Sequence, residues 1–228
     1  MTCEEVIINL KKLASTSKKD IEGMARFGIN VENALCVSMP KIRKYAKEIG
    51  KNHELALQVW DSGIHEAKIL AGLIDDREKV TDVQMEKWVS EFDSWDVCDQ
   101  VIMNLFDKTE FAYKKAKEWA ERDEEFVKRA GFAMMASLAV HDKKASNELF
   151  IGFLKLIKEK STDERNFVRK AVNWALRQIG KSRNIELYNI ALKTAYEISE
   201  IDDKTARWIA KDAIRELESD AVKKRLLI

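Results

Sequence analysis

The segment FVRKAVNWALRQIG, residues 167–180, decides the fold that this 228-residue sequence predicts. Its apolar residues recur at the 3.6-residue period of an amphipathic α-helix: Val168, Ala171, Val172, Ala175 and Ile179. Three further segments carry small or apolar residues at matching positions when Ala171 is aligned with Ala67, Ala130 and Ala206: IHEAKILAGLI (64–74), FVKRAGFAMMASLA (126–139) and KTARWIAKDAIREL (204–217). Residues 167–180 are therefore one copy of a repeated helix.

The copies occur at the spacing of paired helices. The segment WDVCDQVIMNLF (95–106) fits between the first two copies with Cys98 at the alanine position, which gives steps of 31, 32, 41 and 35 residues. Each copy follows another segment with helical periodicity, so the helices come in pairs. Such pairs predict an all-α fold, an α-solenoid of HEAT-like repeats that curves and has a concave groove lined by the second helices. We expect a single domain over residues 1–228; an irregular helical bundle is the alternative.

Apolar periodicity and capping residues predict where the helices begin and end. Ser38, Thr81, Ser94, Thr109 and Asp123 each precede a periodic run, as residues that cap helix N-termini do. No run shows the alternation of a strand. The expected helices lie near residues 3–14, 18–27, 39–49, 53–61, 64–74, 82–92, 95–107, 110–121, 124–140, 146–159, 164–180, 185–199 and 203–217, with a last turn after 219.

The composition agrees with a helical, folded chain. One proline and eight glycines argue against collagen-like, linker-rich and turn-rich all-β proteins. Charged residues make up 35% of the chain, but 46% hydrophobic residues argue against disorder. With 40 basic and 39 acidic residues, the chain as a whole does not attract nucleic acid, so such a partner must bind to local basic patches. We expect those patches in the concave groove and the acids on the outer helices.

Motifs of several common site classes do not occur in the sequence. No run of about 18 apolar residues is present, and the N-terminus is acidic where a signal peptide is basic. The three cysteines form no C-x-x-C pair and the histidines form no H-E-x-x-H motif, so we expect neither a metal nor a cofactor. A reducing, cytoplasmic location is the default expectation for such cysteine usage.

A basic ridge is predicted on the helix at 164–180. Trp174 lies about 120° from the centre of the apolar stripe, beside Lys170, Asn173, Arg177 and Lys181, which follow one another at steps of three or four residues. An indole beside a basic ridge combines a stacking surface with charges that pair with phosphates, so this ridge is a candidate DNA-binding surface. A tryptophan packed against the next repeat, with a solvated basic face around it, is the alternative.

The helix near 95–107 carries an aspartate that capping does not explain. Asp96 follows Ser94 in the first turn, where a carboxylate stabilises the helix dipole. Asp99 lies beyond that turn, at the edge of the apolar stripe and one turn after Trp95. A half-buried carboxylate needs a cationic partner, either an arginine of a neighbouring helix or a cation on a ligand.

Two other groups of basic residues are notable. Arg129 projects in line with Ala133 and Ala136, so something large, such as a backbone, could approach it closely; a helix buried on both sides, with Arg129 paired to an acid, explains the pattern equally well. A second group surrounds Glu48 and has a local charge of +4, which a solvated helix face would also explain: Lys41, Arg43, Lys44, Lys47 and Lys51.

Six segments on the paired helices together form a recognisable pattern. Three carry the candidate site residues: EFDSWDVCD (91–99), VKRA (127–130) and FVRKAVNWALR (167–177). Three others lie near the start of the chain: GINVEN (28–33), MPKIRKYAK (39–47) and HELALQVWDSGIHEAK (53–68). In this arrangement the sequence resembles the AlkD family of DNA alkylation repair glycosylases, over about residues 28–215.

The resemblance implies a function and a set of site residues. It implies HEAT-like repeats that bind duplex DNA and a monofunctional base-excision repair enzyme, which hydrolyses the N-glycosidic bond of cationic purines such as 3-methyladenine and 7-methylguanine. Asp99 would be the catalytic carboxylate, Trp95 and Trp174 the aromatic walls, and Arg129 the residue that holds the DNA backbone beside the lesion. No metal or cofactor is implied, and a monomer suits a protein that wraps DNA.

Two other functions compete with this one. A non-catalytic HEAT-like module would bind damaged or branched DNA with a strong salt dependence but release no base. A solenoid that binds proteins would leave the basic ridge as solvent-exposed surface.

Overall fold

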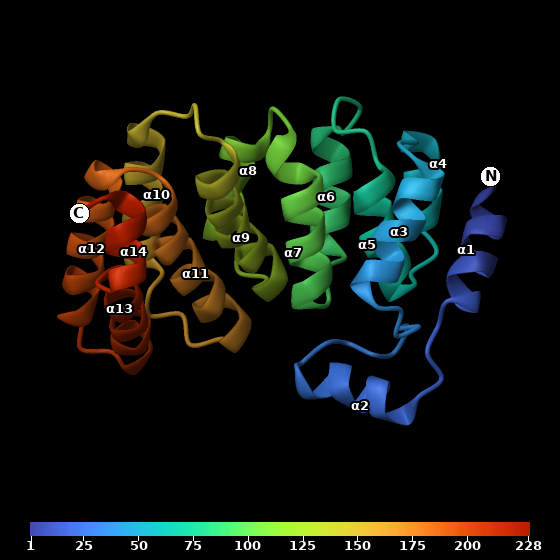
Figure 1. Cartoon of the computed structure of the whole chain (residues 1–228), viewed down its shortest axis with the longest axis horizontal. Helices are drawn as coiled ribbons and strands as arrows, with labels where there is room; N and C mark the ends of the chain where they lie inside the picture. Colours follow the sequence, from blue (N-terminus) through green and yellow to red (C-terminus); the bar gives the residue numbers. More distant parts are fainter. The chain divides into compact units, whose positions relative to one another are not determined.

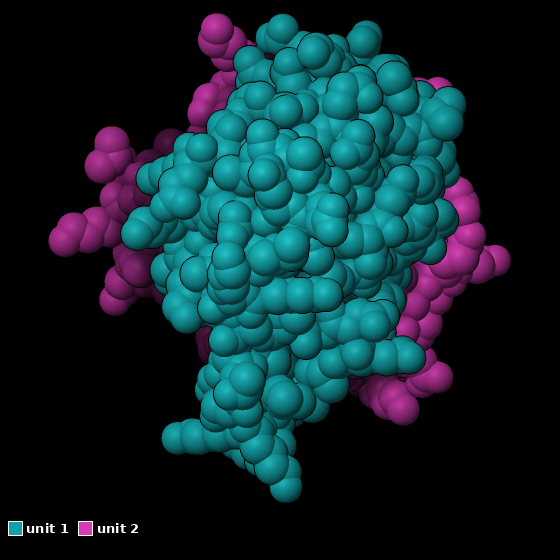
Figure 2. All heavy atoms as spheres, turned by 90° about the vertical axis from the view of Figure 1, so that its right-hand side faces the viewer, with its two compact units in different colours: residues 1–111 teal, residues 112–228 magenta.

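The computed structural model describes residues 1–228 and is all-α, with fourteen α-helices, one 3-10 helix and no strand. The chain divides into two compact units, Met1–Phe111 and Ala112–Ile228, which are drawn as ribbons in Figure 1 and coloured separately in Figure 2. The single domain expected over residues 1–228 remains a prediction. Each expected helix is present, with ends that differ from the expected ones by a few residues.

The first unit contains seven α-helices in two layers. In one layer α5 (His65–Ile74) packs between α3 (Met39–Ile49) and α7 (Trp95–Asn104). In the other layer lie α1 (Cys3–Lys12), α4 (His53–Trp60) and α6 (Asp82–Ser90), while α2 (Lys18–Arg26) stands apart and a 3-10 helix, Phe106–Lys108, follows α7. Trp60 of α4 and Trp88 of α6 are buried and stack with ring centroids 4.0 Å apart, which ties the outer helices together within the core.

The second unit is also built in two layers. Three helices pack side by side as one layer: α9 (Glu125–His141), α11 (Asn166–Ser182) and α13 (Lys204–Leu217). The other layer consists of their partners in the helix pairs: α8 (Ala112–Glu121), α10 (Asn147–Glu159) and α12 (Ile185–Ser199). A short last helix, α14 (Asp220–Leu226), packs on α11 and α13. Each unit thus contains helix pairs, as the repeated segments predict.

The predicted helix starts are correct at three positions and wrong at two. Ser38, Thr81 and Ser94 are N-caps, and the hydroxyl of Thr81 accepts the backbone N–H of Gln84 at 3.1 Å. Thr109 does not cap α8, because its N–H and its hydroxyl both donate to the carbonyl of Phe106 and close the 3-10 helix instead. Asp123 lies one residue before the N-cap of α9, which is Glu124.

Helix α9 is buried on both sides. Every residue from Val127 to Ala139 is buried. This agrees with the alternative explanation of the small residues around Arg129, a helix that is buried on both sides. A Cβ atom on Gly131 would lie 2.9 Å from the carbonyl oxygen of Ala116 and closer still to the backbone nitrogen of Ala120. The backbone that approaches α9 so closely is therefore that of α8.

Candidate functional site

The six tryptophans separate into core residues and accessible ones. Trp60, Trp88 and Trp119 are almost completely buried. Trp95 and Trp174, the two predicted wall residues, are only half-buried, and Trp208 is 39% exposed. Part of the surface of these three rings therefore lies outside the core, where an indole can contribute to stacking on a ligand.

The first turn of α7 is fixed by a buried hydrogen-bond network. Ser94 donates its hydroxyl to Asp96 at 2.7 Å, and His65 of α5 donates Nε2–H to the other oxygen of Asp96 at 2.9 Å. Burial alone lowers the pKa of His65, but the hydrogen bond to Asp96 and its negative charge outweigh burial and raise that pKa overall. Burial likewise opposes ionisation of Asp96, whose pKa the same bond and the imidazolium charge hold below the usual range. Asp96 thus has the structural role that its position predicts.

Asp99 and Trp95 lie one turn apart on α7. Asp99 is only 9% exposed, so its carboxylate is more deeply buried than the sequence predicts. Trp95 donates its indole N–H to the carbonyl of Phe27 at 3.0 Å, which holds the ring against the segment that follows α2. The opposite face of α7 packs fully into the core, so the helix presents this carboxylate and this indole from a rigid support.

Arg129 of α9 is held in place by a contact with the first turn of α11. It is 6% exposed, and its guanidinium donates to the carbonyl of Phe167 at 2.8 Å. Phe167 also packs in a tilted arrangement on Phe126 of α9, with ring centroids 5.5 Å apart. This corner of the second unit is thus well packed around the arginine.

Most of the predicted basic ridge on α11 is occupied by acids of α13. Asn173 is 2% exposed and donates to Asp212 at 2.7 Å. Arg177 forms an ion pair with Glu216, and Lys181 reaches the same carboxylate at 2.5 Å. Burial opposes the ionisation of Glu216, but these two partners outweigh it and lower the pKa of Glu216. The expectation that acids lie on the outer helices is therefore wrong here, because α13 belongs to the same layer as α11.

Lys170 and Trp174 are the ridge residues that α13 leaves accessible. Lys170 is exposed and Trp174 is half-buried. On the helical wheel of α11 they lie between the side that contacts α13 and the side of Phe167, which contacts α9. Both side chains therefore lie on the side of α11 that neither α9 nor α13 covers.

The structure brings the predicted site residues together in two groups. Trp95 and Asp99 share α7 in the first unit. The others share α9 and α11 in the second unit: Arg129, Lys170, Asn173, Trp174, Arg177 and Lys181. Each group combines an accessible indole with a charged group.

Comparison with known proteins identifies the family. The family model described as "DNA alkylation repair enzyme" matches residues 8–217. The chain belongs to this family. The AlkD-like resemblance of the sequence is thereby confirmed, since the match extends over nearly the whole chain.

Two curated bacterial proteins and one solved structure are similar to this DNA alkylation repair family member. The chain is 25% identical, over 175 residues and 75% of both chains, to "Uncharacterized protein Lin0241" of Listeria innocua serovar 6a and, to the same extent, to "Uncharacterized protein Lmo0209" of Listeria monocytogenes serovar 1/2a. A solved structure described as "a new family of proteins related to the HEAT-like repeat DNA glycosylases with affinity for branched DNA structures" aligns with a TM-score of 0.78 and 21% identity, over 94% of this chain and 95% of that one. The HEAT-like fold class is thus confirmed.

A basic stripe on α13 of this DNA alkylation repair family member was not predicted from the sequence. Trp208 stacks against Arg169 of α11, with the guanidinium carbon 5.0 Å from the ring centroid. Four exposed basic residues lie along α13 at helical spacing: Lys204, Arg207, Lys211 and Arg215. The spacing of these bases in KTARWIAKDAIREL was the signal that could have found the stripe.

None of the helices combines the length and the apolar character that a membrane span requires.

Proposed function

We propose that the protein is a monofunctional DNA glycosylase that hydrolyses the N-glycosidic bond of cationic alkylpurines, 3-methyladenine and 7-methylguanine, in duplex DNA. The observation that carries the proposal is the pair on α7, in a chain of the DNA alkylation repair family: the buried carboxylate of Asp99 one turn after the accessible indole of Trp95. In this proposal the protein acts as a monomer in the cytoplasm.

The chemistry needs few catalytic groups. A cationic purine is already a good leaving group, so no strong general acid is required. As the N-glycosidic bond breaks, positive charge moves from the base to the deoxyribose, and a fixed carboxylate at Asp99 stabilises that charge and orients the attacking water. The faces of Trp95 and Trp174 attract the cationic base and the electron-poor sugar. The proposal assigns Arg129 to the DNA backbone beside the lesion.

The test of the proposal is release of the free base. Methylated duplex DNA is incubated with the protein, and the products are separated by chromatography. We expect 7-methylguanine and 3-methyladenine to appear in proportion to time and protein, with abasic sites left in the strand. An absence of both bases from an otherwise folded protein would exclude the enzyme function.

The second candidate function is binding of branched DNA without excision. The solved structure with the same fold comes from a family described by its affinity for branched DNA structures. The stripe on α13 offers the exposed Trp208 and Lys211 for such a partner, while its other three bases form ion pairs with neighbouring acids at the surface. This function predicts tighter binding of a four-way junction than of a linear duplex, with no base released from either.

DNA binding by the accessible part of the ridge predicts opposite effects of two substitutions. Lys170→Gln should weaken binding of undamaged duplex about threefold and reduce the salt slope of log Kd by about 1, because one phosphate contact is lost. Glu216→Gln should strengthen binding, because Arg177 and Lys181 lose the carboxylate that now neutralises them. Fluorescence anisotropy at several salt concentrations measures both effects.

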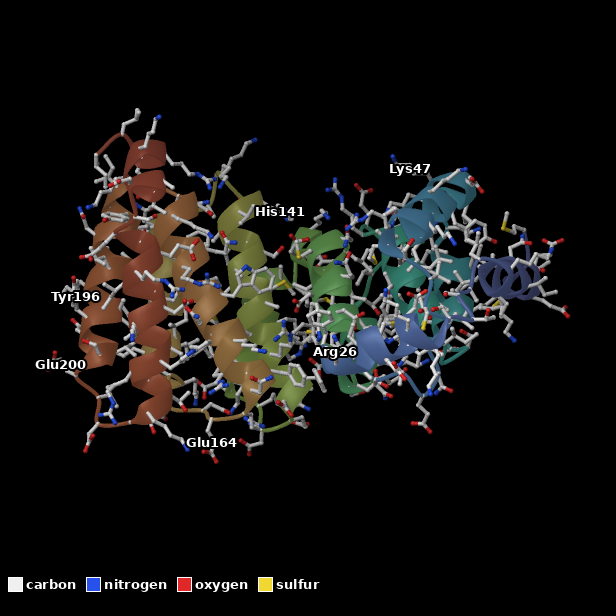
Figure 3. The ribbon with its side chains drawn as sticks, turned by 60° about the horizontal axis from the view of Figure 1, so that its bottom comes forward. Arg26, Lys47, His141, Glu164, Tyr196 and Glu200 are labelled. Atoms are coloured by element: carbon white, nitrogen blue, oxygen red, sulfur yellow. The ribbon has the colours of Figure 1, made fainter.

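Each substitution has a matched control on α12 or at its C-terminal end: Lys193→Gln for Lys170→Gln, and Glu200→Gln for Glu216→Gln. Lys193→Gln and Glu200→Gln make the same charge changes at exposed positions, and Glu200 is labelled in Figure 3. Neither should change the affinity by more than the error of the measurement. If Lys170→Gln and Lys193→Gln behave alike, the ridge does not bind DNA, and a solenoid that binds proteins becomes the better interpretation.

A further inference from the structure

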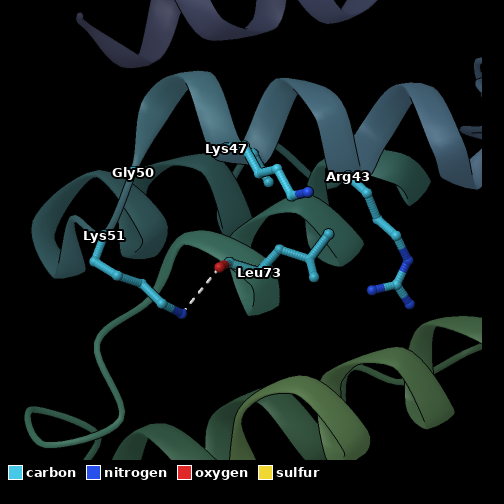
Figure 4. Close-up of a pocket in the computed structure, with 6 residues that line it drawn as sticks. Arg43, Lys47, Gly50, Lys51 and Leu73 are labelled. Atoms are coloured by element: carbon cyan, nitrogen blue, oxygen red, sulfur yellow. Dashed lines mark hydrogen bonds between the residues drawn. The ribbon is translucent and has the colours of Figure 1, made fainter.

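A pocket with a volume of about 400 Å³ lies between α3 and the C-terminal end of α5. Figure 4 shows that the side chains of Arg43 and Lys47 leave α3 on the same side, while the amine of Lys51 reaches the carbonyl of Leu73. The residues that line the pocket include three cations and no acid: Arg43, Ala46, Lys47, Gly50, Lys51 and Leu73. A cationic wall over an apolar floor fits an anionic ligand.

The basic cluster around Glu48 divides between the two sides of α3. Lys41, Lys44 and Glu48 line a different pocket, on the side of α1, and Lys41 donates to the carbonyl of Leu13 at 3.3 Å. The one acid of the cluster is therefore beside Lys41 and Lys44. Arg43 and Lys47 face the other way, so their charges are concentrated in the pocket.

Arg43 is held in place by neutral groups. Its guanidinium donates to Gln100 Oε1 at 2.9 Å and to Asn104 Oδ1 at 3.4 Å, both on α7. Asn104 in turn donates its amide to the carbonyl of Gln100 at 2.6 Å and to Gln100 Oε1 at 3.2 Å, which orients both amide oxygens. Amides fix the position of a guanidinium without neutralising its charge, and they leave its remaining N–H groups for a ligand.

Lys51 closes the pocket at the opposite end. Its amine donates to the carbonyls of Leu73 and Asp75, at 3.0 and 2.7 Å, and thus caps the end of α5. Burial lowers the pKa of Lys51 and the positive charge of Lys108 lowers it further, while the carboxylates of Asp75 and Asp76 oppose that shift.

We propose that this pocket binds a phosphate of the DNA backbone and that Arg43 is a positioning residue for the helix that carries Asp99. Gln100, the residue after Asp99, touches Arg43 directly, so a phosphate on Arg43 fixes the DNA strand relative to α7. A phosphodiester offers two oxygens to a guanidinium, and Lys47, one turn along α3, is exposed and available for a neighbouring oxygen. The inference rests on the proposed function for the catalytic role of Asp99. Binding of DNA to the pocket can be tested without that role.

The test compares substitutions on α3 in the full-length protein. Arg43→Gln and Lys47→Gln should each weaken binding of undamaged duplex about fivefold and reduce the salt slope by about 1. Arg43→Lys should restore the slope, because the charge returns, but release base more slowly than wild type at saturating protein, because the two-point contact with phosphate and amides is lost. Lys44→Gln is the matched control: it removes the same charge from the side of α3 that faces α1 and should leave affinity and slope unchanged.

Each outcome decides between distinct possibilities. Equal effects of Lys44→Gln and Arg43→Gln would overturn the inference, since they would show only a general effect of charge. If inorganic phosphate raises the melting temperature of wild type but not of Arg43→Gln, while the DNA slope stays unchanged, the pocket binds a small phosphate and the inference also fails. Because affinity for undamaged duplex requires no chemistry, loss of affinity in Arg43→Gln supports the pocket even if wild type releases no base. Base release with no effect of Arg43→Gln overturns the pocket and leaves the glycosylase intact.

Discussion

The Asp99→Asn variant is expected to release 7-methylguanine about 10²- to 10³-fold more slowly than wild type, the loss typical of removing one preorganised electrostatic group from an active site. Asparagine keeps the size of the side chain but has no negative charge to stabilise the developing charge on the sugar. The single-turnover rate with excess protein measures this step without a contribution from binding or product release. Affinity for undamaged duplex should stay within about twofold of wild type.

The control for Asp99→Asn removes a carboxylate from the surface of the same unit. Glu54 of α4 is exposed, and Glu54→Gln should leave the release rate unchanged. Thermal unfolding of both variants shows whether the fold is kept. A rate for Asp99→Asn close to that of wild type would contradict the catalytic assignment. A loss of duplex affinity as large as the loss of rate would show that the carboxylate acts in binding and not in the transition state.

The sequence predicts the helices and their pairing because the apolar periodicity that defines a helix lies within the helical segment itself. The apolar stripe of α11 repeats every 3.6 residues, so its core face can be identified without knowing what covers it. The same property places Trp95 and Asp99 one turn apart on α7 and Trp174 away from the core face of α11. Local periodicity is thus enough to define the layer that the candidate site residues occupy.

The partners of the basic ridge could not be predicted in the same way. They depend on how α11 and α13 are aligned along their axes, and a stripe looks much the same after a shift of one turn. The alanine alignment gives a step of 35 residues, at which Lys181 meets Glu216. Three other contacts pair residues 39 apart: Arg169 with Trp208, Asn173 with Asp212 and Arg177 with Glu216. The difference is about one helical turn. The pairing of Asn173 with Asp212 and of Arg177 with Glu216 becomes visible only when the packing fixes that alignment.

The Gly131→Ala variant is expected to be strongly destabilised, with a free energy of unfolding lower by about 3 kcal/mol, at the upper end of what overpacking costs. The new Cβ atom would meet the backbone of α8 at Ala116 and Ala120. Backbone atoms of a helix cannot move aside as the end of a flexible side chain can, so α8 and α9 would have to separate. Urea denaturation followed by circular dichroism measures the change as a lower midpoint at an unchanged m-value.

The same substitution at Gly152 should have the opposite sign. Gly152 lies within α10, and no atom lies within 4 Å of the place that a Cβ would take, so alanine adds no clash there. Alanine restricts the unfolded chain and favours the helix, and Gly152→Ala should therefore stabilise the protein by about 0.5–1 kcal/mol. A similar loss of stability in both variants would mean that the close approach of α8 and α9 is absent in solution. Because Arg129 lies two residues before Gly131 on α9, separation of these helices would also displace the residue proposed to hold the DNA backbone.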